Sequence, residues 1–273
     1  MSLAWVVHIG AGHWQKSAVE KTQALGYRTL AVDGDPEAAG FNVSDAKLLV
    51  DISCPEAVLA AVSTFFSSLD CKPVAVVCTA CEIGILSAGH VREFYGLPGL
   101  NLNLSKKMIS KSEQRCAWSS FSSHNFITLQ LDNLDVDQLK ERFGEETVIV
   151  KPTDSSGSRG ISALRACNIS SADLDHAFKH SQTNEIIVES YIEGIEYTVE
   201  SVRIASETHI ILVTKKEKVL GTNSTVANLL VSCDLGKDRM AALHCLIQRA
   251  HDVLFYADGV CHTEVIEDQN GQF

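Results

Sequence analysis

The sequence lacks a long apolar run and a basic run. A membrane-spanning helix needs about 20 consecutive apolar residues, and no stretch approaches that length. Lys and Arg number 23 against 34 Asp and Glu, which gives a net charge of −11. A protein that binds nucleic acid needs a clustered basic face to displace counterions. We therefore expect neither a membrane nor a nucleic acid as a partner.

The nine cysteines lack the framework that is typical of small secreted domains. Their number is odd, they are scattered, and the N-terminus has no charged segment followed by an apolar one. We expect a reducing compartment, with the cytoplasm as the location. With 273 residues, 45% hydrophobic and 21% charged, the chain is long enough for two or three globular domains.

The first half of the chain alternates short apolar runs with helical patterns, as in an α/β fold. Strands are expected at residues 4–9, 28–32, 46–50 and 74–77, and helices at 15–25, 55–69 and 85–95. The first three elements form a βαβ unit of the doubly wound type. Gly96-Leu-Pro-Gly99 then breaks the pattern, and we expect a domain boundary there.

Gly10-Ala-Gly12, at the end of the first strand, is similar to the turn of a dinucleotide site, with Asp33 placed for a ribose. Gln15, however, stands where the fingerprint has its third glycine, and the two residues after Gly12 are bulky. Two glycines alone are a weak signal. A nicotinamide-dependent oxidoreductase that uses these residues is kept as the weaker alternative.

Cys78-Thr-Ala-Cys81 follows the strand expected at 74–77. It is either a redox pair, half of a metal site or two ordinary core cysteines. We favour the structural interpretation because a second Cys-x-x-Cys is missing. Glu82 lies beyond the strand end, where open α/β sheets place ligands, and is a candidate substrate residue.

The second half combines helices with strands that alternate polar and apolar residues, the pattern of antiparallel sheets. Strands are expected at 126–131, 147–150, 161–164, 185–191, 196–203, 208–214, 224–232 and 260–266, and helices at 105–121, 135–143, 171–180 and 238–256. Ser105 is the expected N-cap of the first of these helices, which carries Lys106, Lys107 and Lys111. Ser170 and Asp173 predict a capped start for the helix at 171–180.

The stretch from Thr147 to Gly160 is the strongest functional signal. A β-branched run delivers Lys151 at its end, and Pro152, which lacks an N–H, is expected to stop inner-strand pairing. A loop rich in serine and glycine follows. Its backbone N–H groups can fold around an anion while the lysine supplies positive charge, so we interpret it as a nucleotide phosphate site. An ordinary hairpin loop is the alternative, and the stretch is not a Walker A loop.

Five features fall in one order: a lysine-bearing helix after a Rossmann-like unit, Lys151 at a strand end, the serine and glycine loop, two acidic strands joined by a glycine turn, and Glu264 on a late strand. This order resembles the ATP-grasp superfamily, and His262-Thr-Glu264 is similar to its carboxylate-amine ligase group. The resemblance implies a Rossmann-like α/β domain at 1–103, followed by a two-lobed α+β ATP-grasp domain with lobes at 104–190 and 191–273.

The resemblance also implies roles for single residues. Lys107 and Lys151 match the two lysines that bind nucleotide phosphates. Residues 154–160 match the flexible loop over the β- and γ-phosphates, with Ser155, Ser156, Gly157, Ser158, Arg159 and Gly160. Glu189 matches the acceptor for the adenine amino group, Ser190, Tyr191 and Ile192 the backbone beside the ring, Glu196 the ribose carboxylate and Glu264 the first Mg²⁺ ligand. Lys151 and Arg159 are the implied catalytic residues.

The implied reaction is an ATP-dependent ligation. A substrate carboxylate attacks the γ-phosphorus, ADP leaves, and an amine or similar nucleophile displaces phosphate from the acyl-phosphate. ATP and Mg²⁺ are the implied cofactors, small carboxylates and amines the implied partners, and a homodimer is left open.

Two features depart from the family pattern. The second metal-binding acid is expected on a strand after that of Glu264, but the sequence ends at Phe273. Residues 214–225 lack the Glu, His and Pro of the amino-acid ligase branch, although Lys215 or Lys216 is a further phosphate candidate. A non-catalytic module that binds a nucleotide or a partner is therefore a second alternative.

Overall fold

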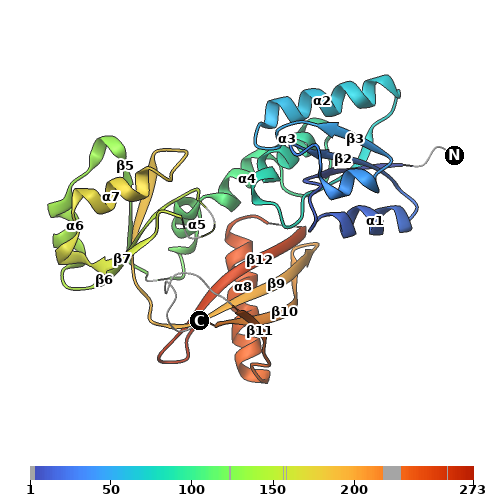
Figure 1. Ribbon diagram of the computed structural model, residues 1–273. Helices are drawn as coiled ribbons and strands as arrows, with labels where there is room; N and C mark the ends of the chain where they lie inside the picture. Colours follow the sequence, from blue (N-terminus) through green and yellow to red (C-terminus); the bar gives the residue numbers. More distant parts are fainter. Residues whose placement is uncertain (1–3, 123, 156, 158, 218–228, 257) are drawn as a thin grey trace. The chain divides into compact units, whose positions relative to one another are not determined.

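The computed structural model describes residues 4–122, 124–155, 157, 159–217, 229–256 and 258–273 (Figure 1). The chain divides into two compact units, residues 1–106 with 256–259 and residues 107–255 with 260–273. The predicted domain boundaries at residues 103 and 190 stay predictions. In the described part of the chain, no helix is both long enough and apolar enough to cross a membrane.

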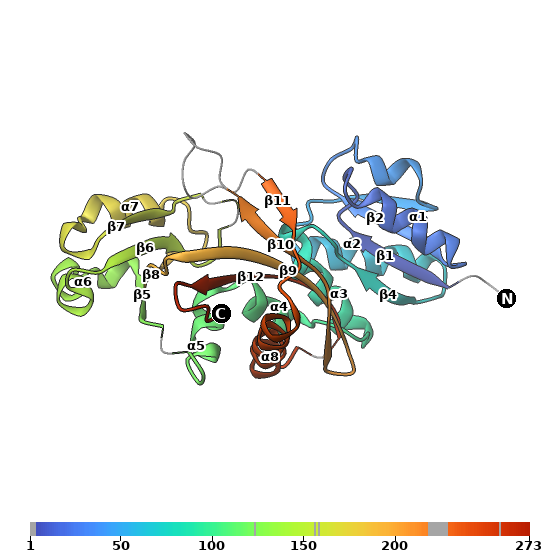
Figure 2. The ribbon, with the colours of Figure 1, turned by 90° about the horizontal axis from the view of Figure 1, so that it is seen from below.

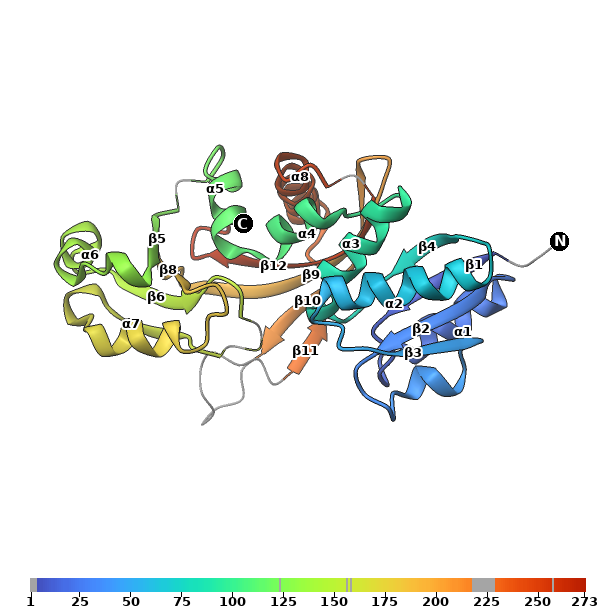
Figure 3. The same ribbon diagram turned by 90° about the horizontal axis from the view of Figure 1, so that it is seen from above.

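Unit 1 is built on a parallel sheet, sheet A, with the strand order β3-β2-β1-β4. Its elements are β1 (Trp5–Ile9), α1 (Lys16–Ala24), β2 (Arg28–Asp33), β3 (Ala46–Leu49), α2 (Pro55–Ser68), β4 (Pro73–Val77), η2 (Glu82–Gly84), α3 (Ile85–Tyr95) and the start of α4 (Leu102–Ile109). Figure 1 shows α1 on one side of the sheet and α2 on the other, and α2 and α3 lie side by side (Figure 3). The predicted α/β fold of this half is confirmed.

The apolar runs of unit 1 form one core because parallel strands covered on both faces are buried throughout. All five residues of β1 are buried. The core also takes residues from β2, α2 and α3, namely Leu30, Val32, Val58, Val62, Phe66 and Val91. Because all the strands of sheet A are parallel, their carboxyl ends lie at the same edge of the sheet.

The single helix predicted from Ser105 to about residue 121 is wrong. Two helices occupy this range, α4 and α5 (Lys111–Trp118), and Ser105 lies buried inside α4. The break is at Ser110, whose backbone is extended and whose side chain accepts the N–H of Glu113. The N–H of Lys111 donates instead to the carbonyl of Thr153, 3.0 Å away. A tertiary hydrogen bond thus replaces the helical one.

Unit 2 contains two antiparallel sheets. Sheet B has the strand order β5-β8-β6-β7. Its elements are β5 (Phe126–Gln130), α6 (Val136–Phe143), β6 (Thr147–Pro152), β7 (Ser162–Arg165), α7 (Ser171–Phe178) and β8 (Glu185–Ser190). The core between helices and sheet includes Leu139, Phe143, Val148, Val150, Leu174, Ile186 and Val188. The capped start of α7 at Ser170 and Asp173 is confirmed.

Pro152 does not end the pairing of β6 as predicted. Pairing with β7 stops at Val150, but pairing with β8 continues through Pro152, which lies opposite Ile186. Proline lacks only the N–H. The N–H of the next residue, Thr153, donates to the carbonyl of Glu185 at 3.2 Å and keeps the two strands together.

Sheet C has the strand order β11-β10-β9-β12. Its elements are β9 (Gly194–Ile204), β10 (Glu207–Glu217), β11 (Leu229–Ser232), α8 (Lys237–Val253) and β12 (Gly259–Asp268). Helix α8 lies against the long strands (Figure 2), and its residues Leu243 and Ile247 share a core with Val199, Val213 and Val265. Of the strand predicted at 224–232, residues 224–228 lie outside the described residues.

Candidate functional site

Two charged side chains meet on the face of sheet B opposite the core helices. Lys151 on β6 and Glu189 on β8 are diagonal neighbours, because Glu189 lies opposite Ile149 and Lys151 opposite Ile187. The ammonium of Lys151 bonds Oε1 of Glu189. Only 14% of the Lys151 side chain and 7% of the Glu189 side chain are exposed. The pair is thus largely shielded from solvent, which strengthens its attraction.

Two further side chains reach the same carboxylate. Nε of Arg115, on α5, donates to Oε2 of Glu189 at 2.7 Å, and Nε2 of His124 lies 3.4 Å from that oxygen. Burial by itself raises the pKa of Glu189, but hydrogen bonding to His124 and the charges of Lys151 and Arg115 outweigh it. They hold the pKa of this carboxyl well below its usual range. The surroundings of Glu189 are therefore rich in positive charge and suit an anion.

The predicted phosphate loop is anchored at both ends. At its start, Oδ2 of Asp154 accepts the N–H groups of Gln182 and Thr183 at 2.9 and 2.7 Å. Nζ of Lys111 donates to the carbonyl of Ser155 at 2.8 Å. At its end, Gly160 has a φ of +72°, and a Cβ there would lie 2.8 Å from Cβ of His180, so that only glycine fits.

Two described residues in the middle of this loop, Gly157 and Arg159, are exposed. Gly157 has a φ of +68°, and a Cβ there would meet no atom within 4 Å. Ser156 and Ser158 lie outside the described residues. Arg159 is therefore accessible to a ligand.

The predicted adenine segment ends β8. Ser190 and Tyr191 donate their N–H groups to the carbonyls of Asn125 and Thr147, both at 2.9 Å. Tyr191 and Ile192 are 45% and 38% exposed. The backbone here is thus held by its neighbours, while two apolar side chains remain accessible to a flat ring.

Sheet C places a second set of charges on the face opposite α8. Lys216 on β10 pairs with Glu264 on β12, and its Nζ lies 3.8 Å from Oε2 of Glu196 on β9. Loss of hydration raises the pKa of Glu264, but the hydrogen bond and charge of Lys216, with smaller effects of His262 and Lys151, lower it below its usual value. The charge of Lys151 thus reaches Glu264 on the other sheet.

The same face carries a histidine paired with a carboxylate. Nδ1 of His262 lies 2.6 Å from Oε1 of Glu200, and both side chains are about half exposed. The alternation of β12 puts His262 and Glu264 on one face. The predicted ribose carboxylate Glu196, the predicted metal ligand Glu264 and this pair therefore share one surface.

The residues at Glu264 do not by themselves fit a magnesium ion. Mg²⁺ requires near-octahedral oxygen ligands, whereas the Glu264 carboxylate is bonded to the ammonium of Lys216. Among the described residues, no group of three or more His, Cys, Asp or Glu side chains is placed to hold a metal ion. The role of Glu264 as a metal ligand stays a prediction.

Comparison with known proteins identifies the second half of the chain. Residues 145–273 match the family model of the ATP-grasp domain. These residues are an ATP-grasp domain. They contain Lys151 and Glu189 of the first charged cluster and Lys216 and Glu264 of the second, whereas Arg115 and His124 precede the matched residues. The predicted superfamily is thereby confirmed.

The sequence relatives are longer than this chain. This chain is 25% identical over 211 residues to the formate-dependent phosphoribosylglycinamide formyltransferase of Burkholderia mallei (strain SAVP1), a match that covers 74% of this chain and 50% of the relative. The enzyme of the same name from Burkholderia vietnamiensis (strain G4 / LMG 22486) is 24% identical over 190 residues, which cover 69% of this chain and 46% of the relative. The chain spans about half the length of the curated relatives it matches.

Solved structures share the fold of the whole chain. The L-amino acid ligase from Bacillus licheniformis superposes with a TM-score of 0.77 at 16% identity, covering 100% of this chain and 65% of its own. The N5-carboxyaminoimidazole synthetase from Staphylococcus aureus complexed with ADP gives a TM-score of 0.73 at 16% identity, covering 100% and 69%. The predicted α/β and α+β fold class is thus confirmed.

No contact of the described residues joins Lys107, the first predicted phosphate lysine, to Lys151 or Glu189, and Arg115 bonds Glu189 instead. The role of Lys107 stays a prediction. Lys107 lies half-buried on α4, before the break at Ser110. The sequence analysis missed Arg115 and His124. The available signal was that Arg115 lies one helical turn after Lys111. It could not be used because the break before α5 was not predicted.

In unit 1, the structure disfavours the dinucleotide alternative. Oδ2 of Asp33 accepts the N–H of Ala11 at 2.6 Å, and its Oδ1 accepts the N–H of Asp35 at 2.9 Å. Both oxygens hold the chain rather than face a ribose. Glu82 is exposed at the start of η2 and stays a candidate substrate residue.

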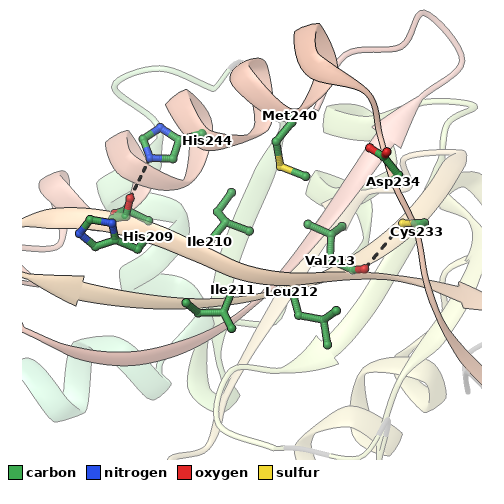
Figure 4. Close-up of a pocket in the computed structure, with 10 residues that line it drawn as sticks. His209, Ile210, Ile211, Leu212, Val213, Cys233, Asp234, Met240 and His244 are labelled. Carbon is green, nitrogen blue, oxygen red and sulfur yellow. Dashed lines mark hydrogen bonds between the residues drawn. The ribbon is translucent and has the colours of Figure 1, made fainter.

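A separate cavity of about 560 Å³ lies along β10 and the start of α8 (Figure 4). It is lined by Thr208, His209, Ile210, Ile211, Leu212, Val213, Cys233, Asp234, Met240 and His244. Apolar side chains dominate, and none of these lining residues is a lysine or arginine. The cavity therefore does not suit a phosphate chain and is distinct from the ATP-grasp cluster.

Proposed function

We propose that this chain is the ATP-binding part of a ligase that activates a small carboxylate as an acyl-phosphate for attack by an amine. The observation that carries the proposal is the convergence of Lys151, Arg115 and His124 on Glu189, a buried residue of the ATP-grasp domain. A triphosphate needs several positive groups held in place. This cluster holds them beside a loop of glycines and serines.

Each cation has a defined part in binding. Arg115 offers a planar fork of N–H donors and Lys151 a compact ammonium group. Glu189 positions both charged groups, because the ammonium of Lys151 bonds its Oε1 and the guanidinium of Arg115 bonds both of its oxygens. On arrival of a nucleotide, phosphate oxygens would share these donors. Positioning and charge neutralisation are what phosphoryl transfer requires of a protein.

The ribose and the adenine of the nucleotide are assigned to residues of β9 and of the end of β8. Glu196 is half-buried on β9 and Tyr191 and Ile192 are accessible at the end of β8, so a ribose and an adenine would bind along the chain between the two sheets of unit 2. Exposed Arg159 on the loop would approach the γ-phosphate.

Calorimetric titration with ATP tests the site. Loss of one charge-assisted hydrogen bond costs about 1.5–3 kcal/mol, so Lys151→Met and Arg115→Met are each expected to weaken ATP binding by roughly 10- to 150-fold. Lys179→Met, which removes an exposed lysine just after α7, is the matched control and should bind as the unchanged protein does.

The reaction is tested by measuring ADP release in the presence of formate or of each standard amino acid. These carboxylates are chosen because the relatives include a formate-dependent enzyme and the similar structures an L-amino acid ligase. Release that depends on one carboxylate supports ligation. ATP binding with no release from any carboxylate would favour the non-catalytic module, and binding of NAD in place of ATP would overturn the proposal.

A further inference from the structure

Two cysteines of unit 1 lie together at the carboxyl edge of sheet A. Cys78 follows β4 directly, and Cys81 precedes η2. Both are half-buried and free. Sγ of Cys78 lies 3.2 Å from the carbonyl oxygen of Cys81 and donates to it. The loop between them therefore folds back so that the first thiol faces the second residue.

Glycines make room for both sulfur atoms. A Cβ at Gly84 would lie 3.2 Å from Sγ of Cys78 and 3.4 Å from Sγ of Cys81, so the two sulfurs are at most about 6.6 Å apart, the sum of those distances. A Cβ at Gly10 would lie 3.0 Å from Sγ of Cys81. Both thiols are free, so the side chains have to turn toward each other to reach the S–S distance of about 2.05 Å that a disulfide requires.

The two thiols differ in acidity. Hydrogen bonding between the two side chains lowers the pKa of Cys81 to about 7, helped by the N–H of Gly84 and opposed by burial and by Asp33. The same interaction, together with burial, raises the pKa of Cys78, against a smaller effect of Arg92. Since the thiolate is the nucleophile, Cys81 is the attacking thiol of the pair.

We propose that Cys78 and Cys81 form a thiol–disulfide exchange site that takes low-molecular-weight disulfides. The thiolate of Cys81 attacks one sulfur of the disulfide, which breaks the S–S bond and releases one small thiolate. Cys78 then gives its proton to a released thiolate and attacks Sγ of Cys81, and the second small thiolate leaves. Two protein thiols are oxidised to one disulfide, while the small disulfide is reduced to two thiols.

The exchange would act on the ligand edge of the sheet. The amide of Gln15 donates to the carbonyls of Thr79 and Ala80 at 3.1 and 2.7 Å, so the loop between the two cysteines is fastened to the start of α1. Because Sγ of Cys81 lies beside Gly10, formation of the disulfide would also change the contacts of Gly10. This site is independent of the ATP-grasp cluster in unit 2, and either proposal can fail alone.

The test is incubation with oxidised glutathione, followed by intact mass and by mapping of disulfides. The unchanged protein should lose two hydrogens without a lasting adduct, and the Cys78–Cys81 bond should be the product. Cys78→Ser should accumulate one glutathione on Cys81, because the resolving thiol is absent. Cys81→Ser should leave Cys78 unmodified. Cys71→Ser, which removes an exposed cysteine elsewhere in unit 1, is the matched control and should still form the bond.

A second measurement needs no variant. Alkylation of Cys81 by iodoacetamide in the unchanged protein should reach half its maximal rate near pH 7, below the value of about 8.5 that is typical of a free cysteine. The proposal is overturned if the Cys78–Cys81 bond does not form, if both serine variants retain glutathione equally, or if Cys81 alkylates with the pH profile of a free cysteine in solution.

Discussion

Lys151 and Glu189 pair across β6 and β8, the two central strands of sheet B, on the face turned away from the core helices. Arg115 and His124 complete the shell around the same carboxylate. Glu189, whose side chain is only 7% exposed, faces three basic groups and holds them together. The site's positive charge therefore depends on one negative residue.

Replacing Glu189 with glutamine should destabilise unit 2. Removal of one partner from a buried ion pair leaves the others uncompensated and costs on the order of 3–5 kcal/mol. Urea unfolding at pH 7 measures the loss. Glu145→Gln, which removes an exposed partner of Arg165, is the control and should leave stability nearly unchanged. Equal effects of both would contradict the buried-cluster interpretation.

The lowered pKa of Glu189 predicts that the stability of unit 2 depends on pH. The folded pKa of this carboxyl lies below the unfolded value of about 4.3. Its contribution to stability is therefore complete above that pH and is lost as the pH falls through it toward the folded pKa. Unfolding free energies between pH 3 and 7 should decline at the acid end in the unchanged protein and decline less in Glu189→Gln. Parallel curves would be the contrary result.

The lowered pKa of His251 predicts a second pH range in which the stability of unit 2 changes. His251 is 3% exposed, and burial, with the nearby charge of Arg203, lowers its pKa to about 4. The unfolded imidazole titrates near 6.5, so stability is complete above that pH and falls as the pH drops from about 6.5 to 4, by roughly 3 kcal/mol.

His251→Asn should flatten the unfolding curve of unit 2 in this window. His8 on β1 also has a pKa of about 4 because it is buried, and it should cause the same decline in unit 1. Hydrogen exchange at pH 4.5 and 7 separates the units. A His251→Asn protein whose β10 and α8 amides lose as much protection on acidification as before would refute the prediction.

Gly89 in α3 should not tolerate alanine, although alanine is the better helix former. A Cβ at Gly89 would collide with Oγ of Ser105 and lie 2.9 Å from the carbonyl oxygen of Asn101. Overpacking of this kind costs about 1–3 kcal/mol, and a lowered melting temperature is the expected result. Thr64→Ala, on the exposed face of α2, is the control and should be neutral or slightly stabilising.

Gly157 and Gly160 offer a matched pair in the phosphate loop. Both have positive φ, which costs a side chain about 1–2 kcal/mol. Space around Gly157 is open, whereas a Cβ at Gly160 would also meet His180 and Pro152 at 2.8 and 3.0 Å. Thermal unfolding should therefore show a larger loss for Gly160→Ala than for Gly157→Ala. The reverse order would mean that the loop packs differently.

Elements with strong local patterns were predictable from sequence. The buried run of β1, the proline at the start of α2 and the capping box of α7 each fix an element through its own residues. Lys151 was predicted as a site residue because it ends a β-branched run, whereas Glu189 was predicted from the resemblance to the ATP-grasp superfamily. The direct bond between them was not predicted, because register between strands is a tertiary property.

The sequence by itself determined the α/β half, the antiparallel half and the acidic and glycine-rich segments between them, since hydrophobic period and turn residues act over short ranges. Only the tertiary structure decided which cations reach Glu189. The carbonyl of Thr153 takes the N–H of Lys111 and so starts α5 at that residue. This break turns Arg115 toward Glu189, through a hydrogen bond between residues 42 positions apart that no local pattern encodes.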